Sequence, residues 1–247
     1  GILALEEEYK DGKRHGWYRK YNNRGFLENV SQYVDGKQTG TVKDYYNTGR
    51  LSGEGALIDD KFDGPLKTWH ENGKLKSEGN YSNGKKIGLW KTYYKDGSIE
   101  TENNFTDGEL DGECKEYYQS AKLFKKLVYK LGKLNGKVET FAEDGKIYSD
   151  IVYEKGRLKD INFYNKQGVN ISSSSSRKGE VNVTFLDADG NKTSLGTYDR
   201  DGLQQGRGIY YYINGTVSAE AEYKDGMLNG KRTTYYSNGT KKDEVTY

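Results

Sequence analysis

Two kinds of side chain recur at fixed spacing in this sequence and are able to bind a partner. Aromatic rings stand at Tyr46, Tyr94 and Tyr118, and Trp69 occupies the adjacent aromatic position of another repeat. Aromatic rings in a row on an exposed sheet can hold a peptide, a glycan or another apolar surface. Alternatively, the same rings form a ladder from repeat to repeat that only supplies the core. We predict partner contacts at Tyr46, Trp69, Tyr94 and Tyr118.

Lysine recurs in the same way. Lys37, Lys61 and Lys85 each follow the first Gly of a repeat or the residue in its place. If the repeats stack as hairpins, neighbours in this Lys row lie about 10 Å apart, which is two strand spacings. Such a row could attract acidic lipid headgroups or an acidic partner. Equally, lysines in turns are solvated and discourage edge association, and interspersed acidic residues leave a net charge of only +2.

A second set of charges is predicted to stabilise the sheet. Lys43, Lys67 and Lys91 share one position, and Glu54, Glu78 and Glu102 share another, in what would be adjacent strands. Pairs across antiparallel strands contribute roughly 0.2–1 kcal/mol each. We therefore interpret these columns as structural.

Catalytic and metal-binding patterns are not found in the sequence. His15 and His70 are the two histidines and lie in different repeats, so neither a histidine metal site nor a Ser-His-Asp triad can be assembled. The run from Asp187 to Asn191 alternates like the start of a calcium loop, but Gly190 comes too early, and an ordinary turn is predicted. Cys114 falls in a column of apolar residues and is predicted to be a small buried hydrophobe. We predict no cofactor and no enzymatic activity.

A period of 24 residues organises the elements that carry these side chains. The first Gly of the period recurs at Gly12, Gly36, Gly84, Gly108, Gly132 and Gly156, and a second Gly follows four residues later in most repeats. A fixed period of this length indicates a repeat architecture. The D-G and N-G pairs suit turns with positive φ, and their spacing leaves room for strands but not for helices.

Each repeat is therefore predicted to be a β-hairpin, for example with strands near 17–22 and 27–33. In the outgoing strand the apolar column of Val42 and the aromatic column of Tyr45 differ by three residues. Either a bulge re-aims one column or aromatic rings lie on both faces.

The predicted fold is all-β: an elongated, single-layer, twisted antiparallel meander of stacked hairpins. Residues 1–168 hold about seven units, 169–198 hold a Ser-rich loop and a degenerate hairpin, and 199–247 hold two further units.

The pattern G-x-x-x-G-x-W-x-x-Y-Y-x-x-G-x-[LI]-x-x-E-x-x-Y-x-x-G, clearest in residues 84–108 and 202–226, resembles the MORN repeat. The resemblance is to the second variant, found in bacterial proteins and often labelled YwqK-family antitoxin-like. It implies stacked hairpins in one long twisted sheet. It also implies scaffolding, contact with proteins and, in some eukaryotic members, association with membranes or phosphoinositides.

The expected function is a non-catalytic repeat scaffold that contacts an unknown protein partner. The alternative is binding of acidic membrane lipid or surface glycan through the Lys row or the Tyr ladder. The small net charge argues against nucleic acid as a partner. Because the chain begins with Gly1, we expect a removed signal, which favours a periplasmic or cell-surface location over a cytoplasmic one.

Overall fold

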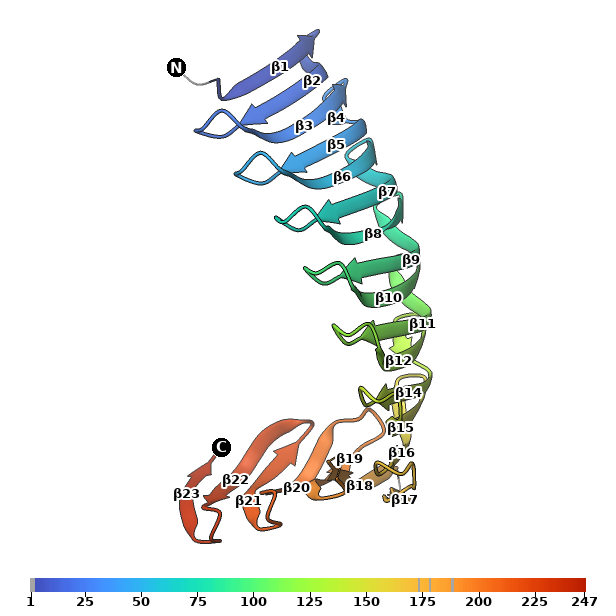
Figure 1. Cartoon of the computed structure of the whole chain (residues 1–247), viewed down its shortest axis with the longest axis vertical. Coiled ribbons are helices and arrows are strands. Elements are labelled where there is room, and N and C mark those ends of the chain that lie inside the picture. The colour runs from blue at the N-terminus through green and yellow to red at the C-terminus, as the bar shows by residue number, and fades with distance from the viewer. Residues whose placement is uncertain (1–2, 173, 178, 188) are drawn as a thin grey trace. The chain divides into compact units, whose positions relative to one another are not determined.

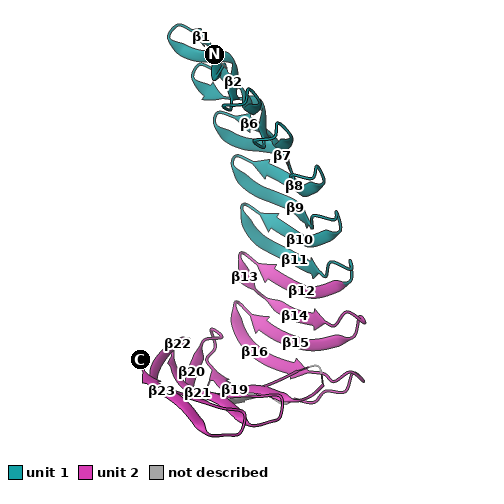
Figure 2. Ribbon diagram, turned by 60° about the vertical axis from the view of Figure 1, so that its left-hand side comes forward, with its two compact units in different colours: residues 1–122 teal, residues 123–247 magenta. Residues whose placement is uncertain are grey.

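A computed structural model of the chain describes residues 3–172, 174–177, 179–187 and 189–247. These residues contain no helix, and strands make up 67% of the structure. The chain divides into two compact units, Gly1–Lys122 and Leu123–Tyr247 (Figure 2). The predicted all-β fold of consecutive antiparallel hairpins is confirmed.

In unit 1 the order of strands in the sheet follows the order in the chain, and neighbours are antiparallel (Figure 1). Its strands are β1 (Leu5–Lys10), β2 (Lys13–Tyr21), β3 (Leu27–Val34), β4 (Lys37–Gln38), β5 (Gly40–Tyr45), β6 (Leu51–Ile58), β7 (Lys61–Trp69), β8 (Leu75–Ser82), β9 (Lys85–Tyr93), β10 (Ile99–Thr106) and β11 (Glu109–Tyr117). The two-residue β4 pairs with β3 beside β5.

Unit 2 contains strands of two sheets. In the first, β12 (Leu123–Lys130) pairs with β13 (Lys133–Leu134) and β14 (Gly136–Phe141), followed by β15 (Ile147–Glu154) and β16 (Arg157–Phe163). The second runs in chain order through β17 (Ser175–Arg177), β18 (Glu180–Leu186), β19 (Lys192–Tyr198), β20 (Gln204–Tyr211), β21 (Val217–Lys224), β22 (Met227–Tyr235) and β23 (Lys241–Thr246). The segment predicted as 169–198 lies inside unit 2, and Ser173 and Lys178 of its Ser-rich run lie outside the described residues.

Two kinds of turn alternate along the chain. A hairpin turn closes each repeat, and a connecting turn, usually D-G or N-G, leads into the next repeat. In the connecting turn at Asp107 and Gly108 both residues have positive φ, 53° and 89°. Asp, Asn and Gly tolerate this left-handed conformation, which matches the twist of the flanking strands. The D-G and N-G pairs therefore fix where one repeat ends.

The sheet of unit 1 has two unlike faces. Lys91 lies directly opposite both Glu78 and Glu102, so these charges share one face, which we call the polar face. Trp90, the preceding residue, points to the other face, where it is 5% exposed and its ring meets Tyr81 edge-on. Side chains alternate between faces along a strand. The polar face and the apolar face are therefore distinct along β9.

Aromatic rings lie on both faces, which settles the alternative that the sequence left open. Tyr93, two residues after Lys91, lies on the polar face, and its Oη donates a 2.7 Å hydrogen bond to Glu78. A bulge is also present, on the partner strand. Leu75 lies opposite Trp69 and Ser77 opposite Thr68, so Lys76 is the extra residue.

The apolar face of unit 1 holds a narrow core. Val42, Leu57, Trp90 and Cys114 are buried, and Cys114 is 1% exposed, which confirms it as a buried hydrophobe. A Cβ on Gly79 would lie 2.2 Å from the Trp90 ring, so the indole lies flat on this glycine. Small residues opposite large rings let one sheet bury side chains of this size.

Unit 2 buries a larger cluster, which joins its two sheets. Leu158, Ile161 and Phe163 of β16 pack with Val181, Val183 and Leu186 of β18. The Tyr148 hydroxyl also donates to the Leu186 carbonyl. This core coincides with the part of the chain where the repeat pattern is weakest.

Candidate binding surfaces

The polar face of unit 1 carries a charge ladder. Lys43 pairs with Glu54 at 3.3 Å, Lys67 with Glu78 at 3.5 Å, and Lys91 with Glu102 at 3.1 Å. Each pair lies directly opposite in the register, as predicted for the two charge columns. Signs alternate from strand to strand, so the ladder presents neither an acidic nor a basic surface.

Tyrosine hydroxyls complete this ladder. Tyr93 donates to Glu78, and Tyr117 donates to Glu102 at 2.8 Å. These bonds, followed by those from Lys67 and Lys91, lower the pKa of Glu78 and Glu102. Burial, followed by the same hydrogen bonds, raises the pKa of Tyr93 and of Tyr117 to about 12. The carboxylates are thus held charged and the phenols neutral.

Beside the ladder runs an apolar track. Trp17, Thr41, Pro65 and Leu89 each lie two residues before a cation of the ladder column, on the same face of β2, β5, β7 and β9. Trp17 is 38% exposed and Leu89 is 43% exposed. The sequence contains this signal, because the two-residue offset is visible there, but we did not predict these residues as a site.

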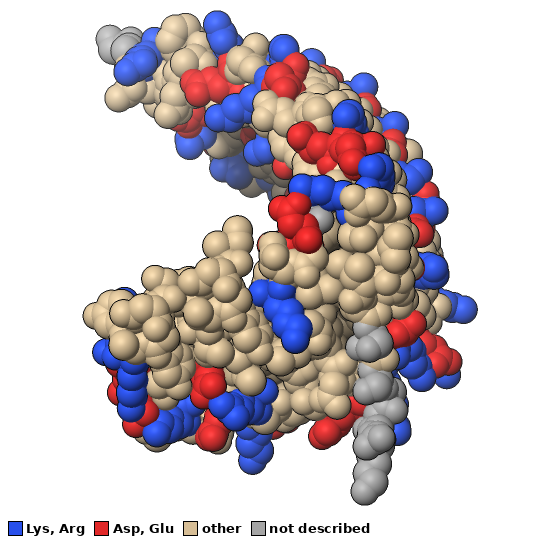
Figure 3. All heavy atoms as spheres, turned by 60° about the horizontal axis from the view of Figure 1, so that its bottom comes forward, with Lys and Arg blue, Asp and Glu red and all other residues tan. Residues whose placement is uncertain are grey.

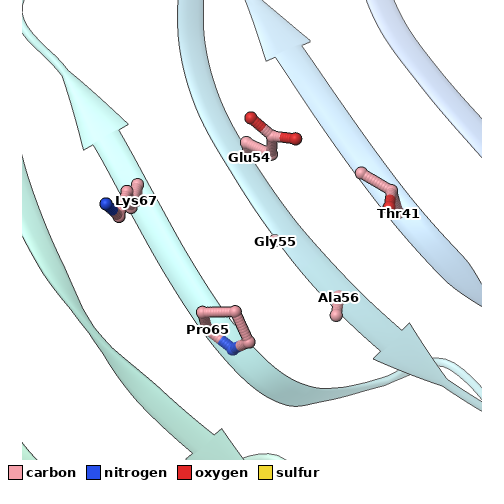
Figure 4. Close-up of a pocket in the computed structure, with 6 residues that line it drawn as sticks. All are labelled: Thr41, Glu54, Gly55, Ala56, Pro65 and Lys67. Carbon is pink, nitrogen blue, oxygen red and sulfur yellow. The ribbon is translucent and has the colours of Figure 1, made fainter.

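A hollow of about 280 Å³ interrupts the track between its two largest side chains. Thr41, Ala56 and Pro65 line it together with Gly55, and Glu54 and Lys67 stand at its margin (Figure 4). Small side chains at these positions form the hollow. Figure 3 shows another view of the surface, in which Lys and Arg are interspersed with Asp and Glu.

The predicted Tyr column lies at the hairpin turns, where it joins repeats. Tyr46 Oη donates to the Trp69 carbonyl at 2.6 Å, and Tyr94 Oη donates to the Tyr117 carbonyl at 2.7 Å. Both rings are half-buried, as is Tyr118 one repeat later. These contacts match the structural alternative stated above, and a role of the column in partner binding stays a prediction.

His70 belongs to the same column, although we did not predict it there from the sequence. His70 stands where other repeats have Tyr, and its Nε2 lies 2.8 Å from the Tyr93 carbonyl. It therefore makes the same junction with an imidazole. Trp69 is half-buried on the strand before it, opposite Leu75.

Each lysine of the Lys row in unit 1 contacts the next connecting turn. Lys37 Nζ lies 3.5 Å from Asp59, and Lys85 Nζ lies 2.8 Å from Asp107. Lys61 Nζ donates to Asn83 Oδ1 at 3.1 Å. The three predicted lysines therefore link turns, and their binding of lipid or partner also stays a prediction.

A buried carboxylate in unit 2 was not predicted as a distinct feature. Asp150 is 3% exposed, accepts hydrogen bonds from Asn162 at 2.8 Å and Tyr164 at 3.1 Å, and pairs with Lys137 at 3.3 Å. Burial opposes its charged form, but these three donors together lower the pKa of Asp150. It occupies the position of the ladder glutamates, but the residue directly opposite on β14 is Glu139, and its cation comes from Lys137, two residues earlier.

Within the described ranges, no group of three or more His, Cys, Asp or Glu side chains is arranged to hold a metal ion. No helix that could span a membrane occurs in the same residues.

A family model described as a MORN repeat variant matches residues 62–83, 86–107, 134–155 and 228–247. These segments belong to the 24-residue repeat found above, so the resemblance to the MORN repeat is confirmed for them. MORN repeats are generally associated with protein and membrane binding. No curated protein matches the chain.

Solved structures similar to the chain contain much longer chains. The crystal structure of TcdB2-TccC3 is 12% identical, covers 98% of this chain and 18% of that chain, and gives a TM-score of 0.22. The structure of a Photorhabdus luminescens Tc holotoxin pore is 11% identical, with 96% and 17% covered and a TM-score of 0.19. The chain thus spans less than a fifth of these proteins, and TM-scores this low do not establish a shared fold.

Proposed function

We propose that this chain is a non-catalytic scaffold that binds a protein partner on the polar face of unit 1. The apolar track beside the charge ladder carries the proposal. Trp17 and Leu89 are exposed on either side of a hollow with a small-residue floor, and charges of both signs border them. Protein interfaces combine an apolar centre with a polar rim in this way.

The alternating signs of the ladder favour protein over acidic lipid. A lipid surface selects an excess of Lys and Arg, whereas Lys67 and Lys91 are each bonded to a glutamate here. The Lys and Glu side chains of the ladder are also engaged in cross-strand pairs, which supports binding over catalysis. If the antitoxin label of the resembling family describes this chain, the partner would be a toxin.

The test is capture of partners from lysate and envelope fractions of the source cell, with the intact chain as bait and mass spectrometry as the readout. We expect one stoichiometric protein, whose recovery falls about tenfold or more in the Trp17→Ser/Leu89→Ser variant, as for central interface residues. Ile213→Ser is the matched control, since Ile213 is 82% exposed and lies in unit 2.

Recovery that is equal for the double variant and wild type would exclude this face as the interface. Recovery of lipid or polysaccharide in place of a protein would favour the alternative stated from the sequence.

A further inference from the structure

The two connecting turns that follow β12 and β15 in unit 2 differ in charge from those of unit 1. In unit 1 the partners of Lys37, Lys61 and Lys85 are Asp59, Asn83 and Asp107, respectively. The equivalent positions in unit 2, 24 residues apart, hold Leu131 and Lys155. Leu131 follows a turn whose row residue is Glu109 and not a lysine, whereas Lys155 stands where the acidic or amide partner of Lys133 would be.

These substitutions leave lysines without acidic partners. Among the described residues, no carboxylate forms an ion pair with Lys130, Lys133 or Lys155, and all three are exposed. The stem of Lys133 lies over Gly156 as that of Lys85 lies over Gly108, but the residue before Gly156 is Lys155, whereas Asp107 precedes Gly108 and pairs with Lys85. Positive charge thus accumulates along this edge.

A hollow of about 270 Å³ continues the edge at the next turn. Arg157, Lys159 and Arg200 stand around it, and the buried Leu158 and Val181 form its floor. The Leu158 amide donates to the Arg200 carbonyl at 2.9 Å, which brings the turn that contains Arg200 beside β16. We call Lys130, Lys133, Lys155, Arg157, Lys159 and Arg200 the basic edge.

Two carboxylates lie within the basic edge and reduce its charge only in part. Asp201 lies 3.5 Å from Arg157 Nε, and Glu154 lies 2.7 Å from Lys159 Nζ. Both pairs are well exposed, so each contributes little and its cation remains able to exchange partners. The guanidinium of Arg200 forms no ion pair within the described residues.

Leu131 is a second, independent observation at the same edge. It is 62% exposed and has a φ of 49°, in the left-handed region where the unit 1 turns use Asp or Asn. A bulky residue is disfavoured in this conformation, and strain of this kind concentrates at functional positions. An exposed Leu between Lys130 and Lys133 is therefore available to contact an apolar group of an acidic ligand.

We propose that the basic edge binds an acidic peptide segment of a partner protein in the polyproline II conformation, with carboxylates at every third residue. Successive connecting turns lie about 10 Å apart, and a polyproline II chain has three residues per turn and rises about 3.1 Å per residue, so every third side chain returns to the same side after about one turn spacing. A hollow with a buried floor suits an inserted side chain better than a flat lipid surface. The proposal deepens the scaffold function proposed above and rests on the chain being a protein-binding scaffold.

The test uses fluorescence anisotropy with the full chain and a labelled synthetic peptide that has Glu at every third residue and Ser or Thr between. The probe variant is Lys130→Glu/Lys133→Glu/Lys155→Glu. The matched control is Lys10→Glu/Lys76→Glu/Lys95→Glu, which changes net charge equally but alters exposed lysines of unit 1 that lie outside the Lys row and the charge ladder. Circular dichroism checks that both variants fold. We expect folding to be retained because all six side chains are exposed.

We expect the unit 2 variant to bind the peptide at least about tenfold more weakly at physiological salt, because three ion pairs are reversed. The unit 1 variant should bind nearly as wild type does. A peptide of the same composition with its glutamates in one block should bind about threefold more weakly, as for one lost ion pair.

Equal loss in both variants would show a response to net charge alone and overturn the proposal, as would equal affinity for both peptides. Binding to vesicles of phosphatidylserine and phosphatidylcholine, with no binding to either peptide, would overturn it in favour of lipid. These outcomes leave the polar face of unit 1 unaffected, so capture through Trp17 and Leu89 tests the scaffold function separately.

Discussion

Tyr94 Oη donates a 2.7 Å hydrogen bond to the main-chain carbonyl of Tyr117, the residue 23 positions later in the next repeat. The same bond joins Tyr46 to Trp69 and Tyr212 to Tyr235. In these three repeats a side chain at the end of the outgoing strand thus joins the repeat to its neighbour. This contact accounts for the recurrence of tyrosine there, because stability in a repeat array depends on such neighbour terms.

Tyr94→Phe removes this bond and leaves the ring in place. We expect the free energy of unfolding of unit 1 to fall by about 1 kcal/mol, the usual net value of one hydrogen bond. Urea unfolding followed by circular dichroism measures the change, and amide exchange should locate the loss in β9–β11.

Tyr236→Phe is the matched control for this prediction. Tyr236 holds the same position in the last repeat, is 52% exposed, and its hydroxyl makes no hydrogen bond within the described residues. Its removal should change stability by no more than a few tenths of a kcal/mol. Equal effects of the two substitutions would contradict a joining role for the hydroxyl.

Gly79→Ala should destabilise unit 1 because its Cβ would lie 2.2 Å from the Trp90 ring. The indole must move out of its buried position, and overpacking of this kind costs about 1–3 kcal/mol. Thermal and urea unfolding measure the loss. Trp90→Val in the same chain should recover part of it, since Val42 and Val138 occupy this column elsewhere.

Gly53→Ala separates this clash from a general effect on strands. Gly53 lies in β6 with a negative φ, and its Cβ would find no atom nearer than 3.9 Å. We expect no loss, or a gain of up to about 1 kcal/mol from the less flexible unfolded chain. Destabilisation as large as that of Gly79→Ala would show that the Trp90 contact is not the cause.

The Tyr–Glu pairs predict loss of stability at both ends of the pH scale. The pKa of Glu78 is lowered from 4.5, so its contribution is present above that pH and is lost as pH falls below it. The pKa of Tyr93 is raised from 10.0 to about 12, so stability is complete below pH 10.0 and falls as pH rises toward 12. Urea midpoints measured across pH test both limbs.

The Tyr93→Phe/Tyr117→Phe variant isolates the alkaline limb. Without ionisable hydroxyls bonded to Glu78 and Glu102, the loss of stability above pH 10.0 should become smaller. The acid limb should remain, because Lys67 and Lys91 still lower the pKa of the two glutamates. An alkaline limb identical to that of wild type would assign it to other groups.

The hairpins and their turns could be predicted because the period and the D-G pairs are local signals. The two faces could not be assigned by counting alone. Lys76 is an extra residue in the return strand, so Leu75 and Glu78 are one step closer in register than their numbering suggests. Bulges of this kind depend on pairing with the neighbouring strand, which a period-two count does not contain.

The charge ladder was predictable for a related reason. Lys67 and Glu78 lie beyond the Lys76 bulge, but opposite charges recur at these two positions in adjacent strands, so their pairing could be expected without the exact register. Asp150 was not predictable as a buried group, because the residues that surround it, such as Asn162 and Tyr164, follow the point where the repeat pattern weakens. The apolar track was visible in the sequence, but exposure of Trp17 and Leu89 depends on the whole sheet.

Leu131→Asn should stabilise unit 2 and weaken peptide binding at the same time. Leu131 has a φ of 49°, a conformation that Asn adopts more readily than Leu, so the free energy of unfolding should rise by about 0.5–1 kcal/mol. Loss of the exposed apolar side chain should reduce affinity for the spaced acidic peptide severalfold. Ile58→Asn is the control, since Ile58 is 57% exposed in a strand and should gain no stability. Stabilisation with unchanged peptide affinity would assign Leu131 no part in binding, whereas lower stability would show that the Leu side chain supports the fold.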